Sequence, residues 1–312
     1  MKILVTGGAG FIGSHVADKL IEKGHEVHIA DNLSGGFRHN IPDKAVFHQL
    51  DIRDSKFTGL WKAHNFEALY HLAAQMDVRK SVADPKFDAD INIIGLLNLL
   101  EAGRQGGLKK VIFSSTGGAI YGEPEFGGPQ DEDHPRNPMS PYGITKLVSE
   151  HYLRFYADVH GIKYVNLRYG NVYGPRQNAH GEAGVVAIFT ERMLRGQDCF
   201  INGDGLQTRD YVHVDDVVQA NILALDYDKN DTFNVGTATE TNVVELFQHL
   251  RDHCGSDTPQ THAEAKPGEQ KRSVLDVTKI QNVLGWKQKW EVREGLKNTV
   301  DWFRQRKEKA GA

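Results

Sequence analysis

Met1-Lys-Ile-Leu-Val-Thr-Gly-Gly-Ala-Gly-Phe-Ile-Gly13 is the segment that constrains the architecture of this 312-residue chain most strongly. An apolar run leads into glycines at positions 7, 10 and 13, and a helical pattern follows at about residues 14–23. Glycines in this setting let backbone amides approach a pyrophosphate at the positive end of a helix. The stretch therefore predicts a strand, a glycine loop and a helix, the first unit of a nucleotide-binding sheet.

The rest of the chain continues this alternation of apolar runs and helical patterns. Further strands are expected at residues 26–30, 45–49, 68–72, 110–114, 163–168 and 232–235. Strands that alternate with helices pair in parallel through right-handed crossovers. We predict an α/β fold, with a Rossmann-like, doubly wound parallel sheet and a smaller α/β C-terminal lobe. The expected domains are residues 1–172 with about 211–240 for the sheet, and about 173–210 with 241–312 for the substrate lobe.

Composition and charge argue against several classes of protein. The formal net charge is -4, so there is no basic field of the kind that a nucleic-acid binder needs. Cys199 and Cys254 are too few for a disulfide framework, and the 15 histidines show no metal-site spacing, so no metal is expected. The start lacks an apolar signal segment, and no apolar run approaches membrane-spanning length. We expect a cytoplasmic protein with neither nucleic acid nor membrane as partner.

An acidic residue after the second expected strand bears on the choice of cofactor. Asp31 stands 18 residues after Gly13, where a carboxylate accepts hydrogen bonds from a ribose 2′-hydroxyl and repels a 2′-phosphate. This favours NAD over NADP. The alternative is an ordinary turn-forming aspartate. Asp51 and Ile52, after the third strand, are candidates for the adenine edge.

The segment Tyr142-Gly-Ile-Thr-Lys146 predicts the chemistry. Residues four apart on a helix lie on one face, one turn apart, so the ammonium can approach the phenol. A nearby cation lowers the pKa of a phenol, and Tyr142 could then exchange a proton with a sugar hydroxyl near neutral pH. The motif alone is common, and its weight comes from Ser114, Ser115 and Thr116 at a strand end, where ligands of parallel sheets collect. Any one of these hydroxyls could merely cap or turn the chain.

Taken together, these motifs resemble the extended short-chain dehydrogenase/reductases (NAD-dependent epimerase/dehydratase family), and within them the UDP-glucose 4-epimerases. The resemblance spans essentially the whole chain. It rests on residues 6–15, 31–32, 71–74, 114–116, 142–146, 167–176, 203–205, 209–216 and 233–236. It implies an isomerase that interconverts UDP-glucose and UDP-galactose with bound NAD, with UDP-GlcNAc and UDP-GalNAc as further candidate substrates.

The resemblance also implies a role for each matching residue. Tyr142 would be the general base and acid, Lys146 would bind the nicotinamide ribose and lower the Tyr142 pKa, and Thr116 would hydrogen-bond the reacting hydroxyl. The implied cofactor contacts are Gly7, Gly10, Phe11, Ile12, Asp31, Asn32, Asp51, Ile52, Leu72, Ala73, Ala74, Asn92, Ser114, Tyr142, Lys146 and Tyr169. The implied substrate contacts are Gln75, Thr116, Asn171, Arg209, Lys266 and Ser273. Arg209 would pair with the diphosphate, as would Lys266, which stands where the family more often has arginine; both could instead be surface ion pairs.

Two glycines after Thr116 bear on which reaction of the family is catalysed. Dehydrating relatives carry Asp-Glu there and decarboxylating relatives keep the Glu, because their reactions need an extra acid or base. Gly117 and Gly118 leave one proton shuttle, which is enough for a 4-epimerase. The resemblance implies a 4-keto sugar that turns about its diphosphate tether before it is reduced on the other face. Two alternatives stay open: another nucleotide-sugar enzyme (UDP-glucuronate epimerase, dehydratase or reductase), and a non-catalytic NAD-sensing protein.

Ser273 bears on the choice of sugar. In our alignment it falls where a bulky tyrosine restricts some epimerases to unacetylated hexoses. A serine is small, so it predicts room for an N-acetyl group at C2. A loop of different length would shift this alignment, because loops vary in length.

Apolar residues on two helical segments predict a homodimer. The segments at about 87–105 and 141–159 carry more apolar residues than one core face needs. These include Leu96, Leu97, Leu99, Leu100, Leu147 and Tyr152. Related proteins pair these two helices in a four-helix bundle, so the resemblance implies the same dimer here.

Overall fold

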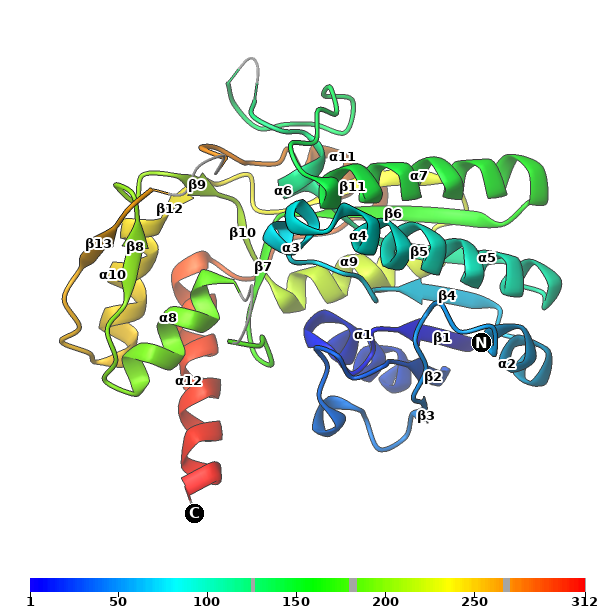
Figure 1. The fold of residues 1–312 in the computed structure, drawn as a ribbon, viewed down its shortest axis with the longest axis horizontal. Helices are drawn as coiled ribbons and strands as arrows, with labels where there is room; N and C mark the ends of the chain where they lie inside the picture. The colour runs from blue at the N-terminus through cyan, green and yellow to red at the C-terminus, as the bar shows by residue number, and fades with distance from the viewer. Residues whose placement is uncertain (125–126, 180–183, 266–269, 312) are drawn as a thin grey trace.

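A computed structural model describes residues 1–124, 127–179, 184–265 and 270–311. Its centre is a seven-stranded sheet in the order β11-β6-β5-β4-β1-β2-β3 (Figure 1), in which every neighbouring pair is parallel. The strands are β1 (Lys2–Thr6), β2 (Glu26–Ala30), β3 (Val46–His48), β4 (Ala68–His71), β5 (Lys110–Thr116), β6 (Lys163–Tyr169) and β11 (Asp231–Val235). All seven expected strands are present, and the predicted fold class is confirmed.

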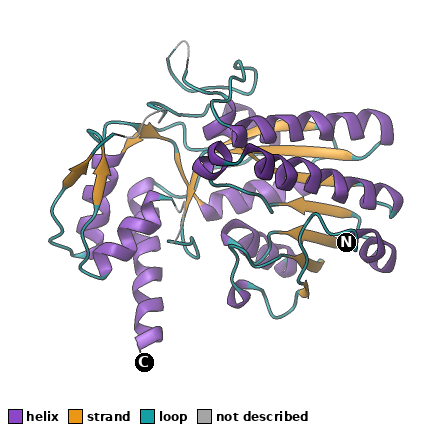
Figure 2. Cartoon of the chain, viewed as in Figure 1, coloured by secondary structure: helices purple, strands orange, loops and turns teal. Residues whose placement is uncertain are grey.

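Helices cover both faces of the sheet (Figure 2). One face carries α1 (Phe11–Glu22), α9 (Val214–Asp226) and α11 (Thr278–Leu284); the other carries α2 (Phe57–His64), α5 (Gly95–Gln105) and α7 (Pro141–His160). Side chains alternate between faces along a strand, so Ile3 and Val5 enter the first core while Leu4 enters the second. Burial on both faces explains why the strands are apolar runs and do not alternate with polar residues.

Short helical segments join the larger elements. They are η1 (Arg38–Asn40), α3 (Val78–Ala83), α4 (Pro85–Ala89), η2 (Asp90–Ile94) and α6 (Gly117–Ile120). Asp84 caps α4 by accepting from the Phe87 amide at 3.0 Å, and Pro85 occupies the first turn, where a missing amide costs nothing. The segment η2 is a π-helical turn that leads into α5.

A second group of elements lies beyond the carboxyl ends of the sheet strands (Figure 1). Its helices are α8 (Val185–Leu194), α10 (Val243–Cys254) and α12 (Val292–Gly311). Its two-stranded pairs are β8 (Phe200–Asn202) with β13 (Thr261–Ala263) and β9 (Thr208–Arg209) with β12 (Thr241–Asn242); β7 (Asn171–Tyr173) and β10 (Tyr211–His213) pair between the two groups. The three helices share a core of their own. No helix in the described part of the chain is long and apolar enough to cross a membrane.

One segment bears on the domain boundaries. Val277, Ile280 and Trp286 pack in the core of the sheet, with α11 against β11 and α9. The expected boundaries place these residues in the substrate lobe. We propose instead that residues 277–286 belong with the sheet and that the other expected boundaries stand.

The apolar residues of α5 serve the interior of the subunit. Leu96, Leu99 and Leu100 are fully buried against the sheet. The expectation that they form an apolar surface for a partner subunit is therefore wrong. The exposed apolar residues of these two helical segments are instead Ile94, Ile144, Phe155 and Val159, with 48–58% of each exposed. Helix period alone did not separate these two sets, because both faces of α5 and α7 carry apolar residues.

Candidate active site

The glycine loop joins β1 to α1 at the carboxyl edge of the sheet. Gly7 has φ 72°, and a Cβ on it would stand 2.6 Å from the Ala73 nitrogen; a Cβ on Gly13 would stand 2.2 Å from the Gly7 oxygen. Both positions therefore require glycine. No side chain caps α1 at Gly10, and the helix begins at Phe11, which leaves its first-turn amides for an anion. The loop fits the pyrophosphate of a dinucleotide.

Asp31 follows β2 and closes the glycine loop. Its carboxylate accepts from the Ala9 amide at 3.0 Å and from the Leu33 amide at 2.8 Å. Burial raises the pKa of this carboxyl, and the two amides oppose that rise. A carboxylate has about four acceptor positions, so the turn-forming role is compatible with ribose binding.

Asn32 and Asp51 lie together beside Asp31. The Asn32 amide donates to Asp51 at 2.9 Å, and Arg53 donates to the same carboxylate at 2.8 Å, which lowers its pKa. The neighbouring Ile52 is buried, and a Cβ on Gly95 would stand 2.6 Å from it. The structure thus brings the adenosine-side candidates together at the ends of β2 and β3.

The end of β4 lies against the glycine loop. The Leu72 amide donates to the Thr6 carbonyl at 3.1 Å, and the Ala73 amide approaches the Thr6 hydroxyl at 3.4 Å. Burial, and then the charge of Lys146, lowers the pKa of the His71 imidazole to about 3. His71 is therefore uncharged at neutral pH, and its ring hydrogen-bonds the Thr6 hydroxyl just before the glycine loop. Ala74, the next cofactor candidate, lies in the irregular segment after β4 and is partly buried.

A buried polar network connects to α7 through Thr145, and the sequence predicted only two of its members, Gln75 and Asn92. Asp88 accepts from Gln75 at 2.8 Å, from Asn92 at 3.1 Å and from the Thr145 hydroxyl at 2.8 Å. Gln75 and Asn92 also exchange backbone to side-chain bonds of 2.9 Å. The two residues expected at the site therefore hold each other and α7 in place, through an aspartate that no motif singled out.

Tyr142 and Lys146 lie one turn apart in α7, as their spacing predicts. The helix begins after Ser140, whose hydroxyl accepts from the Gly143 amide at 3.2 Å, with Pro141 in its first turn. Lys146 Nζ donates to the Ser114 carbonyl at 2.7 Å and lies 5.9 Å from the centre of the Tyr142 ring. The ammonium is thus near the phenol ring but bonded elsewhere.

The electrostatics of this pair differ from the expectation. Burial, with the charge of Asp88, raises the pKa of Tyr142, whereas the sequence predicted that Lys146 would lower it. Burial also lowers the pKa of Lys146 to about 8. Spacing along a helix shows which side chains are neighbours, but the loss of water around both groups decides the direction here.

Thr116, Gly118 and Asn171 face one another where β5 ends. A Cβ placed on Gly118 would stand 3.5 Å from Asn171 Oδ1 and 3.9 Å from the Thr116 hydroxyl. A Cβ on Gly117 would instead stand 2.5 Å from the Leu275 side chain. Any acid at position 118 would therefore project toward the two candidate substrate residues.

The other hydroxyls of β5 point to different surroundings. Ser115 donates to the buried Glu150 carboxylate at 2.6 Å, so it supports the fold. Ser114 hydrogen-bonds Tyr169, whose hydroxyl also receives the Asn221 amide of α9 at 2.8 Å. Tyr169 is almost fully buried, and burial raises its pKa. Its ring lies beneath the site, in the core of the sheet.

Two of the substrate candidates of the C-terminal half, Arg209 and Ser273, lie on segments that hydrogen-bond each other. The two neighbours of Arg209 both bond the segment that carries Ser273: the Thr208 amide donates to the Lys271 carbonyl at 2.9 Å, and Asp210 accepts from the Leu275 amide at 3.2 Å. Ser273 is buried, with 1% exposed. Lys266 lies outside the described residues.

The chain is similar to known proteins over almost its whole length. The model of the NAD dependent epimerase/dehydratase family matches residues 3–236. A putative UDP-glucose 4-epimerase of Methanocaldococcus jannaschii is 47% identical, covering 97% of this chain and 98% of its own. A crystal structure of Thermotoga maritima UDP-glucose 4-epimerase with UDP-glucose is 51% identical with a TM-score of 0.96, covering 98% and 99%. The Thermus thermophilus UDP-glucose 4-epimerase in complex with NAD is 44% identical with a TM-score of 0.94, covering 97% and 99%.

Proposed function

Because this chain belongs to the NAD dependent epimerase/dehydratase family, we propose that it is a UDP-hexose 4-epimerase that interconverts UDP-glucose and UDP-galactose with bound NAD. The observation that carries the proposal is the 2.7 Å bond from Lys146 Nζ to the Ser114 carbonyl, which joins the Tyr142 helix to the end of β5, where Thr116 lies, beside a glycine loop that fits a pyrophosphate. A non-catalytic NAD sensor would have no use for this trio.

Each side chain has a distinct part in the proposed reaction. NAD, when bound, supplies the reversible acceptor for the hydrogen at C4 of the sugar. Tyr142 must act as the phenolate to take the proton of the 4-hydroxyl, and as the phenol it later returns that proton, while the Thr116 hydroxyl holds the same oxygen. Lys146, with its pKa lowered to about 8, is still mostly charged at pH 7 and keeps positive charge beside the phenol. Arg209 binds the diphosphate, about which the 4-keto sugar turns.

The surroundings of Gly118 favour an epimerase over a dehydratase. Its missing side chain would point between Thr116 and Asn171, the place where an additional acid would have to act. An acid at position 117 would require Leu275 to move, because a Cβ there stands 2.5 Å from that side chain. The chain therefore has one proton shuttle at this edge, which suits a reaction with no net loss of water.

Ser273 extends the proposal to N-acetylated sugars. It is buried in the segment that hydrogen-bonds both neighbours of Arg209, so it lies close to the proposed diphosphate site. Its side chain is much smaller than the tyrosine that restricts some epimerases to unacetylated hexoses. We expect UDP-GlcNAc to be a substrate, and Ser273→Tyr to lower its turnover relative to that of UDP-glucose.

The test is an NMR assay of the purified protein with UDP-glucose and, separately, UDP-GlcNAc, without added NAD. Formation of the galacto epimers supports a 4-epimerase that retains its cofactor. Tyr142→Phe keeps the ring and removes the proton carrier, so we expect kcat to fall by about 10²- to 10⁴-fold. A folded protein that converts neither sugar, even with NAD supplied, contradicts the proposal.

We also propose a homodimer through α5 and α7. Ile144, Phe155 and Val159 lie on the exposed side of α7, and Ile94 lies just before α5. Water-facing side chains of this size on two adjoining helices are typical of a surface covered by a partner. Two such pairs of helices would form a four-helix bundle.

A cytoplasmic location is the last part of the proposal. Both cysteines, Cys199 and Cys254, are free thiols in the structure. Disulfides are rare in the reducing cytosol and common in secreted proteins, so unpaired thiols support that location. Reaction with a thiol reagent in the presence and absence of a reductant would show whether both stay reduced.

A further inference from the structure

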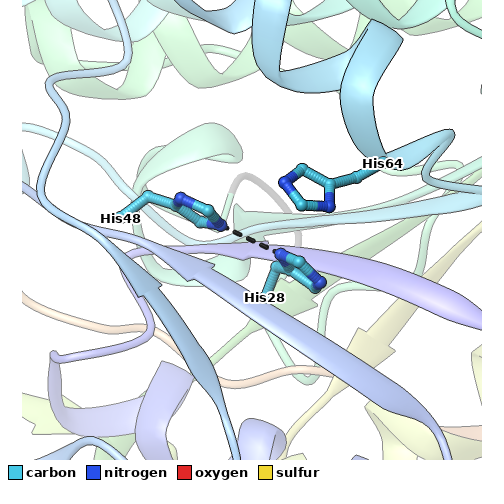
Figure 3. A group of neighbouring side chains, drawn as sticks. All are labelled: His28, His48 and His64. Carbon is cyan, nitrogen blue, oxygen red and sulfur yellow. Dashed lines mark hydrogen bonds between the residues drawn. The ribbon is translucent and has the colours of Figure 1, made fainter.

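Three histidines that are far apart in the sequence meet on one face of the sheet. His28 lies in β2, His48 ends β3 and His64 ends α2 (Figure 3). His48 pairs with Ala30, which lies two residues after His28, so both imidazoles point to the same face. Helix α2 covers that face and brings in His64. One ring nitrogen from each histidine lies within 4.8 Å of the other two.

A carboxylate orients the most buried of the three rings. His28 Nε2 lies 3.1 Å from Glu26 Oε1, and His28 Nδ1 lies 2.9 Å from His48 Nε2. An ionised carboxylate can only accept, so the proton of a neutral His28 belongs on Nε2. The lone pair of Nδ1 then points toward His48. Carboxylate-histidine pairs of this kind orient the ligands of metal sites.

An aromatic neighbour holds two of the rings in place, and two of the three rings can be reached from the surface. Burial lowers the pKa of His28 and His48, while the Glu26 carboxylate acts in the opposite direction on His28. Phe66 packs against the rings of both His28 and His64. His48 and His64 are only partly buried, which leaves a path for an ion.

We propose that His28, His48 and His64 form a binding site for Zn²⁺. Three imidazoles suit Zn²⁺ and its transition-metal neighbours, whereas Mg²⁺ and Ca²⁺ prefer oxygen. Tetrahedral ligation at about 2.0–2.1 Å places two nitrogens about 3.4 Å apart. The 2.9 Å pair must therefore open by about 0.5 Å and His64 must move closer, which small rotations of the rings supply. Within the described residues, no fourth side chain joins the group, so water completes the shell.

The site has a structural consequence. It would join β2, the edge strand β3 and α2, just before the chain reaches Asp51 and its bond with Asn32. The ion is thus placed to hold the edge of the sheet and to steady the adenosine side of the proposed cofactor site. It lies on a different element from Thr116, Tyr142 and Lys146, so it takes no part in the proton transfer.

The experiment uses the NAD-loaded protein without a polyhistidine tag, freed of metal by a chelator. Isothermal titration with Zn²⁺ measures stoichiometry and affinity, and Co²⁺ reports tetrahedral nitrogen ligation through its visible absorption. We expect one Zn²⁺ per chain, a rise in melting temperature, and at least about tenfold weaker binding in His48→Gln and His64→Gln. Glu26→Gln keeps all three ligands and should weaken binding by about 10- to 100-fold.

The matched control is His249→Gln in α10. His249 and His253 are spaced i, i+4 on that helix, a common surface arrangement for adventitious metal binding. Unchanged affinity in this variant, with loss in His48→Gln and His64→Gln, supports the site. The proposal is overturned if the wild-type protein binds no Zn²⁺, if His249→Gln abolishes binding, or if both cluster variants bind as tightly as wild type. Circular dichroism of each variant shows whether it is folded.

Discussion

Replacing Lys146 with methionine should abolish activity and yet stabilise the subunit. Lys146 is 3% exposed, and burial lowers its pKa from an ordinary 10.5 to about 8. At 1.36 kcal/mol per pKa unit, keeping this amine charged inside the fold costs about 3 kcal/mol. Methionine has a similar length and helix propensity. It leaves the Ser114 carbonyl without its donor, at a cost of about 1–2 kcal/mol. The net expectation is a gain of about 1–2 kcal/mol in the free energy of unfolding.

The stability gain of Lys146→Met should depend on pH, because the pKa of Lys146 differs between the folded and unfolded states. The folded pKa of Lys146 lies below the unfolded value, so the cost is fully present below about pH 8 and disappears as the pH rises toward 10.5. The stability gain of Lys146→Met should therefore shrink between pH 8 and pH 10.5. Urea unfolding at several pH values measures it, both without NAD and with excess NAD, because a ligand that binds only the folded state adds its own stabilisation.

Lys110→Met is the matched control. Lys110 is also buried with a pKa lowered to about 8, but it donates to the Leu225 and Tyr227 carbonyls, away from the proposed site. This variant should keep its activity. The reasoning fails if Lys146→Met is less stable than wild type at pH 7 without NAD. It also fails if the difference in the free energy of unfolding between Lys146→Met and wild type does not change between pH 7 and pH 10.5.

Three further predictions concern other parts of the molecule. Asp88→Asn replaces an acceptor of the buried network with a donor, so we expect a loss of about 1–3 kcal/mol in urea unfolding and a lower kcat; unchanged values would contradict the positioning role. Asp31→Asn removes the charge that repels a 2′-phosphate, and should raise the preference for NADP relative to NAD by about tenfold in binding titrations, equivalent to 1.4 kcal/mol; an unchanged ratio would favour the turn-forming role alone. Phe155→Asp places a charge on the proposed dimer surface, where 51% of the phenylalanine is exposed in the subunit, and should give monomers in light scattering without unfolding; a wild-type monomer would refute the dimer.

Local rules predicted the parts of the site that short segments build. The glycine loop follows from residues 1–13, because only glycine accepts the positive φ at Gly7 and the close approach at Gly13. The start of α7 follows from Ser140 and Pro141, and the helical period places Tyr142 and Lys146 on one face. Each of these features involves residues within one or two turns of one another.

Contacts between distant segments could not be predicted in this way. Leu96 and Ile94 are two positions apart and equally apolar, yet the first is buried in the sheet core and the second faces water. Asp88 gains its importance only when Gln75, Asn92 and Thr145 are brought around it. Spacing along the chain likewise gave no sign of His28, His48 and His64 as neighbours.

The order of strands and helices along the chain and the glycine loop could be predicted from the sequence, because they depend on backbone conformation and periodicity. The role of Tyr142 and Lys146 as the reactive pair stays a prediction. The direction in which the pKa of each of these two side chains shifts could not be predicted in this way. Burial raises the pKa of Tyr142 and lowers that of Lys146, against the expectation from spacing alone. A pKa depends on how much water the whole fold removes from a group, and residues from many distant segments share in that removal.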